Sequence, residues 1–174
     1  ALESDVYGNR RIARDLIDRD IAHHFDTGIT EGEMPELVAH FADETGTLRE
    51  SGSMGLMAAQ ALTKGISRCV TIKVADRLDS HQGSAWQNEH GPEMRTGFET
   101  ISNLASHLEA TPFLGDASDN WLNHTTIVCF SEFGRGAELN NQGGRDHSLI
   151  NAMLLLGGDI QGGQVIGASS DLGM

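Results

Sequence analysis

Two short runs rich in β-branched residues, with an amphipathic helix between them, restrict the possible folds of this chain most strongly. Residues 66–74 alternate between apolar and polar side chains, and residues 125–130 form a second apolar run. After Pro92, apolar residues recur at helical spacing: Met94, Phe98, Ile101, Leu104, Ala105 and Leu108. A strand, a helix and a second strand in this order predict an α/β fold with a largely parallel sheet flanked by helices.

The remaining segments add helices at the beginning and apolar runs at the end. Helical patterns cover residues 4–25, restart at Glu33-Met34-Pro35 and cover 53–64, where Ser53 is the predicted N-cap and Gly65 the C-terminal cap. Residues 148–156 are predicted to be a strand or a helix turning into one, and 164–166 a short edge strand. We therefore expect a helical N-terminal segment, 1–45, and an α/β portion, 46–174.

Size and charge exclude some classes of protein. The chain has 174 residues, which fits one domain or a large piece of one, and its abrupt start at Ala1 indicates a processed form or a fragment. A net charge of −13 argues against a general nucleic-acid binder. No apolar run reaches the length of a transmembrane helix, and no signal peptide is recognisable.

Acidic residues and histidines follow both predicted strands. Asp79 and His81 come after the first run, Glu132 ends the second, and Asp146-His147 ends a Gly/Asn-rich loop. Carboxylate and imidazole groups together suit zinc, manganese or iron, and a divalent ion can bind a phosphoryl or sulfuryl oxygen and activate a nucleophile. The alternative is structural: Asp79 and His81 cap the segment after the strand, and Asp146 caps a helix.

Two arginines adjoin these acids. Arg135 and Arg145 are candidates for orienting an anionic group, or they pair with Glu132 and Asp146. The glycine-rich residues 157–163 lack the Lys-Ser/Thr of a P-loop. Two serines are possible nucleophiles, Ser80 and Ser148, but neither lies in a Gly-x-Ser-x-Gly motif.

Four motifs in a fixed order carry a resemblance to a known family. They are Asp79-Ser80-His81-Gln82, Thr126-Ile127-Val128 leading into Ser131-Glu132-Phe133-Gly134-Arg135, Gly144-Arg145-Asp146-His147, and the run Leu155 to Gly167. Over about residues 50–174 the chain resembles the domain of unknown function family 1501, DUF1501, which is grouped with the alkaline phosphatase and sulfatase superfamily.

The resemblance implies a metal-dependent, hydrolase-like α/β fold with two metal sites. Asp79, His81 and His147 would form one site, and Glu132 would contribute to the second. Phe133 then stands where the superfamily has the second member of an Asp-His or Asp-Asn pair. In an alternative alignment, Asp146-His147 is itself that pair. The implied cofactor is a divalent metal such as zinc, calcium or manganese.

The same resemblance gives a function and a location. The substrate would be a small sulfate or phosphate ester, and because family members commonly begin with an export signal, the protein would be periplasmic or exported. The superfamily's nucleophile precedes the matching region, and nothing in residues 1–50 resembles it, so the chain resembles a C-terminal portion. Two rivals remain: a non-catalytic metal- or anion-binding member of the fold with a structural role, and a plain α/β domain whose Asp/His pairs are caps.

Overall fold

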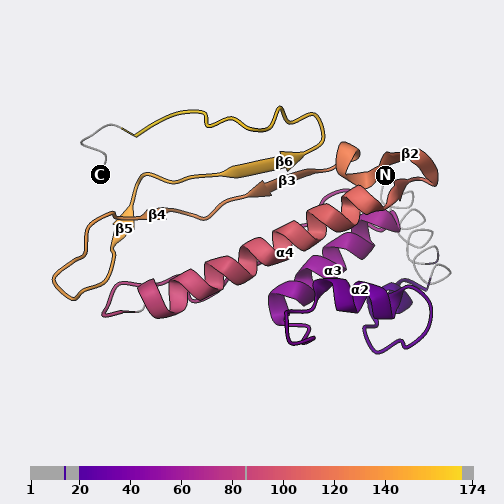
Figure 1. Cartoon of the computed structure of the whole chain (residues 1–174), viewed down its shortest axis with the longest axis horizontal. Helices are drawn as coiled ribbons and strands as arrows, with labels where there is room; N and C mark the ends of the chain where they lie inside the picture. Colours follow the sequence, from indigo (N-terminus) through magenta and orange to yellow (C-terminus); the bar gives the residue numbers. More distant parts are fainter. Residues whose placement is uncertain (1–13, 15–19, 85, 170–174) are drawn as a thin grey trace, which may run out of the picture.

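Three α-helices form the body of the described part of the chain (Figure 1). The structure is a computed structural model that describes residues 14, 20–84 and 86–169. The helices are α2 (Met34–Phe41), α3 (Glu50–Thr63) and α4 (Gly91–Ala110). All three contact one another, with α4 as the longest. None of the helices in the described ranges combines the length and the hydrophobicity needed to cross a membrane.

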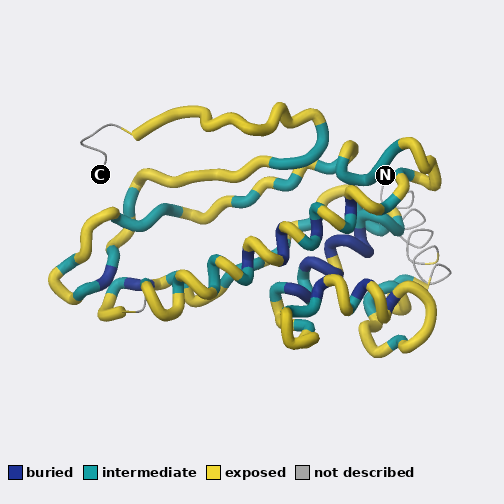
Figure 2. Tube along the Cα trace, viewed as in Figure 1, coloured by how far each residue is buried: buried dark blue, intermediate teal, exposed yellow. Residues whose placement is uncertain are grey.

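The hydrophobic core lies where these helices meet, as the dark segments of Figure 2 show. Its buried members come from all three helices: Met34, Leu37, Phe41, Leu56, Ala58, Ala59, Leu104 and Leu108. Leu56 and Leu108 are fully buried, and each such side chain stabilises the fold by about 1.5–3 kcal/mol. Because α2 contributes to this core, the described part of segment 1–45 packs against the helices that follow it.

Two glycines allow α2 and α3 to approach closely. A Cβ atom at Gly52 would lie 2.3 Å from the carbonyl oxygen of Phe41, and one at Gly55 would lie 2.8 Å from the Phe41 ring. Even an alanine at either position would therefore force Phe41 or the α3 backbone to move.

Three pairs of short strands complete the described chain, and each pair is antiparallel. The pairs are β1 (Pro112–Phe113) with β2 (Asp116–Asn120), β3 (Thr126–Cys129) with β6 (Leu154–Gly157), and β4 (Gly134–Arg135) with β5 (His147–Ser148). Short helical turns η1 (Ile21–Phe25), η2 (Trp86–His90) and η3 (Trp121–His124) link the elements. In the longest ladder, Thr126 pairs with Gly157 and Cys129 with Leu154.

Most predicted helices are confirmed. The patterns after Pro35, at 53–64 and after Pro92 correspond to α2, α3 and α4, and the run 125–130 contains β3. Gly65 has the positive φ expected at a C-terminal cap, but α3 begins at Glu50, so Ser53 is not its N-cap. Of the predicted helix 4–25, residues 4–13 and 15–19 lie outside the described residues.

The predicted strand at 66–74 is wrong, because this segment forms no ladder with any described strand. Val70 and Ile72 nevertheless pack against the helical core. The alternating pattern therefore reflects which side chains face the core, and such a pattern does not require pairing with another strand. The edge strand at 164–166 is likewise absent, and only the end of 148–156 forms strand, in β6.

The largely parallel sheet stays a prediction, since the described residues form antiparallel pairs only. Two segments far apart in the sequence share neighbours in the fold. Val70 and Ile72 in one segment, and Ile127 in the other, contact the helical core, and farther along the chain an ion pair between Asp79 and Arg135 joins the two segments. The candidate site lies at this ion pair.

Candidate metal centre

The site is built from two chain segments that lie against each other near the start of α4. Residues 79–83 and 142–146 are joined by backbone hydrogen bonds, among them one from the amide of Arg145 to the carbonyl oxygen of Ser80 at 2.8 Å. An isolated antiparallel bridge between Gln82 and Gly143 adds to this pairing. The pairing brings side chains more than 60 residues apart in the sequence into one cluster.

Gly144 and Asn140 hold the two segments in this register. Gly144 is buried, and a Cβ atom there would lie 2.1 Å from the carbonyl carbon of His81. Nδ2 of Asn140 donates to the carbonyl oxygen of His81 and to Oδ1 of Asp146, each at 2.9 Å. Its Oδ1 accepts a hydrogen bond from the amide of Gly144 at 3.0 Å. Backbone and side chain together therefore position His81 and Asp146.

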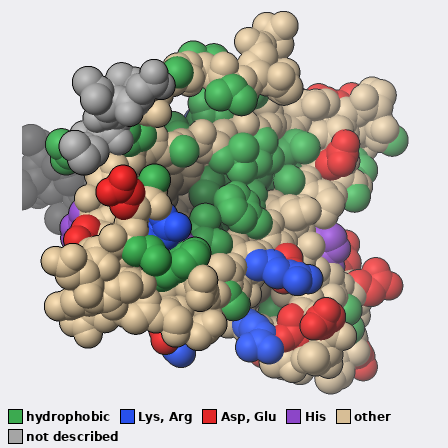
Figure 3. Space-filling view, turned by 60° about the vertical axis from the view of Figure 1, so that its left-hand side comes forward, with side chains coloured by type: hydrophobic (Ala, Val, Ile, Leu, Met, Phe, Trp, Pro, Cys, Tyr) green, Lys and Arg blue, Asp and Glu red, His purple; other side chains and the backbone are tan. Residues whose placement is uncertain are grey.

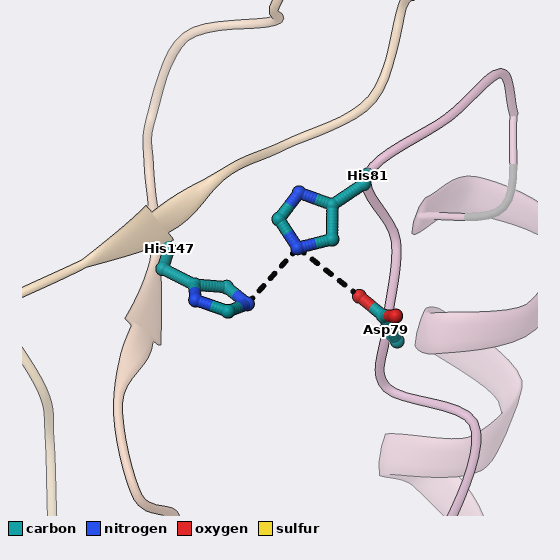
Figure 4. Close-up of side chains that lie close together, drawn as sticks. All are labelled: Asp79, His81 and His147. Carbon is teal, nitrogen blue, oxygen red and sulfur yellow. Dashed lines mark hydrogen bonds and ion pairs between the residues drawn. The ribbon is translucent and has the colours of Figure 1, made fainter.

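Asp79, His81 and His147 converge (Figure 4). Asp79 and His81 come from the segment before η2, and His147 from β5. Nε2 of His81 lies 2.9 Å from Nε2 of His147 and 3.3 Å from Oδ1 of Asp79. One ligand atom from each residue lies within 4.8 Å of the others. His81 is half-buried, and the other two are exposed, so the cluster opens to solvent.

The geometry of these atoms suits a small cation. Two ligand atoms that are each 2.0–2.1 Å from a tetrahedral ion are about 3.3 Å apart. The His81–Asp79 distance of 3.3 Å equals this value, and the His81–His147 distance of 2.9 Å is slightly shorter. Two imidazoles and a carboxylate are also a common donor set for zinc. The residues present therefore fit the implied metal.

Hydrogen bonding of the His81 imidazole makes its Nε2 available to the cluster. Nδ1 of His81 lies 2.8 Å from Oδ1 of Asp146, so the ring donates its Nδ1 proton to that carboxylate. In a neutral imidazole, Nε2 then carries a lone pair. That lone pair faces another acceptor, the Asp79 carboxylate. The same lone pair also lies 2.9 Å from Nε2 of His147, so it can accept a hydrogen bond from that ring or bind a cation shared with Asp79 and His147.

Asp146 lies behind His81, on the side away from the converging ligand atoms. The hydrogen bond with His81, followed by that from Asn140, holds the pKa of the Asp146 carboxyl below its ordinary value. A carboxylate that orients a metal-binding imidazole in this way is a common supporting contact. Asp146 therefore acts on the cluster through His81.

Arg135 contacts the cluster directly. Its Nη2 donates to Oδ1 of Asp79 at 3.0 Å, and its Nη1 donates to the carbonyl oxygen of Arg145 at 3.0 Å. Its carboxylate partner is thus Asp79 and not Glu132, contrary to the pairing considered from the sequence. The guanidinium is fixed beside the cluster and points toward it.

The Arg145 guanidinium has different contacts from that of Arg135. Its Nη1 donates to the carbonyl oxygens of Gly136 and Ala137, and its guanidinium carbon lies 4.4 Å from the centre of the Trp86 ring. The two backbone carbonyls accept hydrogen bonds from this guanidinium, and the aromatic ring makes a cation–π contact with it. Arg145 therefore stabilises the loop that carries Asp146, and its described contacts do not direct it to the cluster.

Glu132 is exposed and does not belong to the converging set that the described residues form. Its neighbour Phe133 is closer to the site, although the sequence indicated only that it departs from the superfamily pattern. The Phe133 ring stacks on His147 with centroids 3.7 Å apart, and the Arg135 guanidinium lies 5.5 Å from its centre. Nothing in the sequence indicated that Phe133, an aromatic residue after a strand, would support the site. The same holds for Asn140, which lies in a polar loop.

Ser80 lies between two cluster residues in the sequence but is 1% exposed. Its hydroxyl faces Nδ1 of His90 at 3.5 Å. A separate cavity of about 510 Å³ lies between α2, α3 and α4 and is lined in part by His40 and His107, and no cluster residue borders it. The chemistry of the cluster is therefore exposed at the surface and independent of that cavity.

Comparison with known proteins identifies a family. A family described as "Protein of unknown function (DUF1501)" matches residues 18–174. No curated protein sequence and no solved structure matches the chain. The match covers most of the chain, and it includes every residue of the cluster. The chain belongs to the DUF1501 family.

Proposed function

We propose that this chain is a metal-dependent, hydrolase-like domain that acts on sulfate or phosphate esters, as in the alkaline phosphatase and sulfatase superfamily. The observation that supports this most directly is the convergence of Asp79, His81 and His147 on a space of metal-site dimensions. These residues would hold one divalent ion. When bound, such an ion supplies a Lewis acid for an ester oxygen and lowers the pKa of bound water.

The donor set favours zinc or manganese over calcium. Calcium prefers six to eight oxygen ligands, whereas two of the three donors here are imidazole nitrogens. Zinc in catalytic sites commonly has three protein ligands and one position left for water or substrate. The exposed face of the cluster leaves room for a small ester on that side.

The chain's own residues have separate tasks in this proposal. Asp146 holds the Nδ1 proton of His81, which keeps Nε2 available as a donor atom. Phe133 packs on the His147 ring and restricts its orientation. Arg135 places a fixed positive charge beside the cluster, where it favours an anionic substrate. A second ion at Glu132 has no support among the described contacts.

A non-catalytic metal- or anion-binding role is the second candidate. It is favoured by the position of Ser80, one of the two candidate nucleophiles, which lies between Asp79 and His81 in the sequence but is buried, with its hydroxyl facing His90. Ser80 is therefore not available as the nucleophile in this conformation. Binding without turnover would identify this second role.

The test measures metal content and turnover separately. After equilibration with zinc or manganese and removal of free ion, we expect about one bound ion per chain by mass spectrometry of the metal. His147→Ala should lower the metal affinity at least about tenfold, because one of three donors is lost. His23→Ala is the control, since His23 is exposed and outside the cluster.

Two results would decide between the candidates. Hydrolysis of 4-nitrophenyl phosphate or 4-nitrophenyl sulfate that requires the ion supports the hydrolase. Metal binding with no turnover of either ester supports the binding role. Unchanged metal content in His147→Ala would contradict both.

A further inference from the structure

One oxygen atom of Asp79 serves two partners. Oδ1 accepts a hydrogen bond from Nη2 of Arg135 at 3.0 Å, and the same atom lies 3.3 Å from Nε2 of His81. Oδ1 is therefore both the atom that faces the cluster and the atom that neutralises Arg135. A cation held by the cluster and the Arg135 guanidinium would have to share it.

Arg135 is held in place more firmly than its carboxylate partner. Its side chain is 13% exposed, whereas that of Asp79 is 77% exposed. A second hydrogen bond, from Nη1 to the carbonyl oxygen of Arg145, ties the guanidinium to the loop, and Phe133 lies beside it. If Asp79 turned toward another cation, the guanidinium would stay near the cluster with its charge uncompensated.

A largely buried charge without a counterion is unfavourable, and like charges on one oxygen repel each other. Arg135 should therefore weaken the binding of a divalent cation when the cation is alone. A tetrahedral oxyanion changes this balance, because a guanidinium matches its geometry and charge. The anion would neutralise both Arg135 and the cation.

We propose that Arg135 makes the binding of a divalent cation and of a tetrahedral oxyanion interdependent, by exchanging Asp79 for the anion as its counterion. This inference depends on the proposed function, because it needs the cluster to bind a cation. It adds an order of preference: the site holds the two ligands together better than it holds the cation alone. Such coupling is reciprocal, so the anion should strengthen cation binding by the same factor by which the cation strengthens anion binding.

The experiment titrates the full chain with Zn²⁺ by isothermal calorimetry, with and without sodium sulfate. Sodium chloride keeps the ionic strength constant, because salt screens the charges concerned. In the unmodified protein, sulfate should increase the Zn²⁺ affinity by about fivefold or more. A titration with sulfate in saturating Zn²⁺ should show the reciprocal increase.

Arg135→Gln should have opposite effects in the two conditions. Without sulfate, Zn²⁺ affinity should rise by about fivefold, because the competing charge is gone. With sulfate, the gain in affinity should be lost or strongly reduced. Arg68→Gln is the matched control, since it removes the same charge from an exposed residue in the segment 66–74 and should match the unmodified protein in both conditions.

The possible failures are distinct. If the unmodified protein binds no Zn²⁺, the proposed function fails and this inference with it. If Zn²⁺ binds but Arg135→Gln binds it no more tightly, or keeps the full effect of sulfate, the coupling through Arg135 is overturned while the metal site stands. A weaker Zn²⁺ affinity in Arg135→Gln without sulfate would show that Arg135 supports the ligands instead of competing for them.

Discussion

His81 is the side chain on which the cluster depends, because it has a carboxylate on each side of its ring. Asp146 faces Nδ1 at 2.8 Å, and Asp79 faces Nε2 at 3.3 Å. The two carboxylates have different partners: Asn140 donates to Asp146, and Arg135 donates to Asp79. Asp146 thus orients the His81 ring through Nδ1, whereas Asp79 belongs with His81 to the set of candidate metal ligands.

Asp146→Asn tests this division between support and ligation. The substitution keeps the size of the side chain but removes the charge that favours the Nδ1 proton, so His81 can adopt the wrong tautomer. We expect the Zn²⁺ affinity to fall about 10–100-fold while about one ion still binds per chain at saturation. Calorimetry or competition with a chelating dye measures both quantities.

Asp159→Asn is the control for that substitution. Asp159 is an exposed residue with a φ of 55°, a conformation that asparagine tolerates well. It should bind Zn²⁺ like the unmodified protein. A loss of the ion altogether in Asp146→Asn would instead assign Asp146 to the ligand set.

At the scale of structural elements, the site forms where two irregular segments pack against each other. The segments 79–83 and 142–146 contribute no long ladder, so their register depends on a few backbone hydrogen bonds and on close contact at Gly144. A side chain there would collide with the His81 backbone. The cluster is therefore sensitive to a residue that carries no functional group.

Gly144→Ala should separate the two segments. Its Cβ would lie 2.1 Å from the His81 carbonyl carbon, a backbone atom that cannot move alone. We expect a destabilisation of about 1–3 kcal/mol, measured by thermal denaturation, together with a clear loss of Zn²⁺ affinity. Gly162→Ala is the control, because no heavy atom lies within 4 Å of its added Cβ. Equal Zn²⁺ affinities for the two variants would contradict the role of this contact.

Across the chain, burial is uneven. The helices hold the buried core, whereas the β3–β6 ribbon and the segments that follow its two strands leave large apolar side chains exposed, including Val128, Phe130, Leu155, Val165 and Ile166. Figure 3 shows apolar side chains gathered in the middle of one face, with charged groups toward its edge. The ribbon gains less from burial than the helices do, and it has only one ladder.

This difference predicts unequal local stability. In hydrogen–deuterium exchange followed by mass spectrometry, backbone amides of α3 and of the second half of α4 should exchange most slowly, because they surround the core. Amides of β3 and β6 should exchange earlier. Protection of β3–β6 equal to that of α3 would show that the exposed apolar face is covered in solution.

The sequence by itself determined the local features. Helix periodicity located α2, α3 and α4, because apolar spacing of 3–4 residues depends on neighbours within one or two turns. Residue chemistry also selected five candidate donors, since few side chains can bind a divalent ion: Asp79, His81, Glu132, Asp146 and His147. The fold brings the ligand atoms of Asp79, His81 and His147 together, as the family resemblance implied.

Only the tertiary structure decided how the selected residues divide their tasks. The contacts of His81 with Asp146 and His147 join residues 65 and 66 positions apart, and they depend on how two loops dock, which no local pattern encodes. In the same arrangement, Glu132 is exposed to solvent and Arg135 forms an ion pair with Asp79. Arg145 contacts loop carbonyls and the Trp86 ring. Among the described strands, none pairs with 66–74, because an apolar alternation fixes which side faces the core, whereas a ladder needs a neighbouring strand at hydrogen-bonding distance.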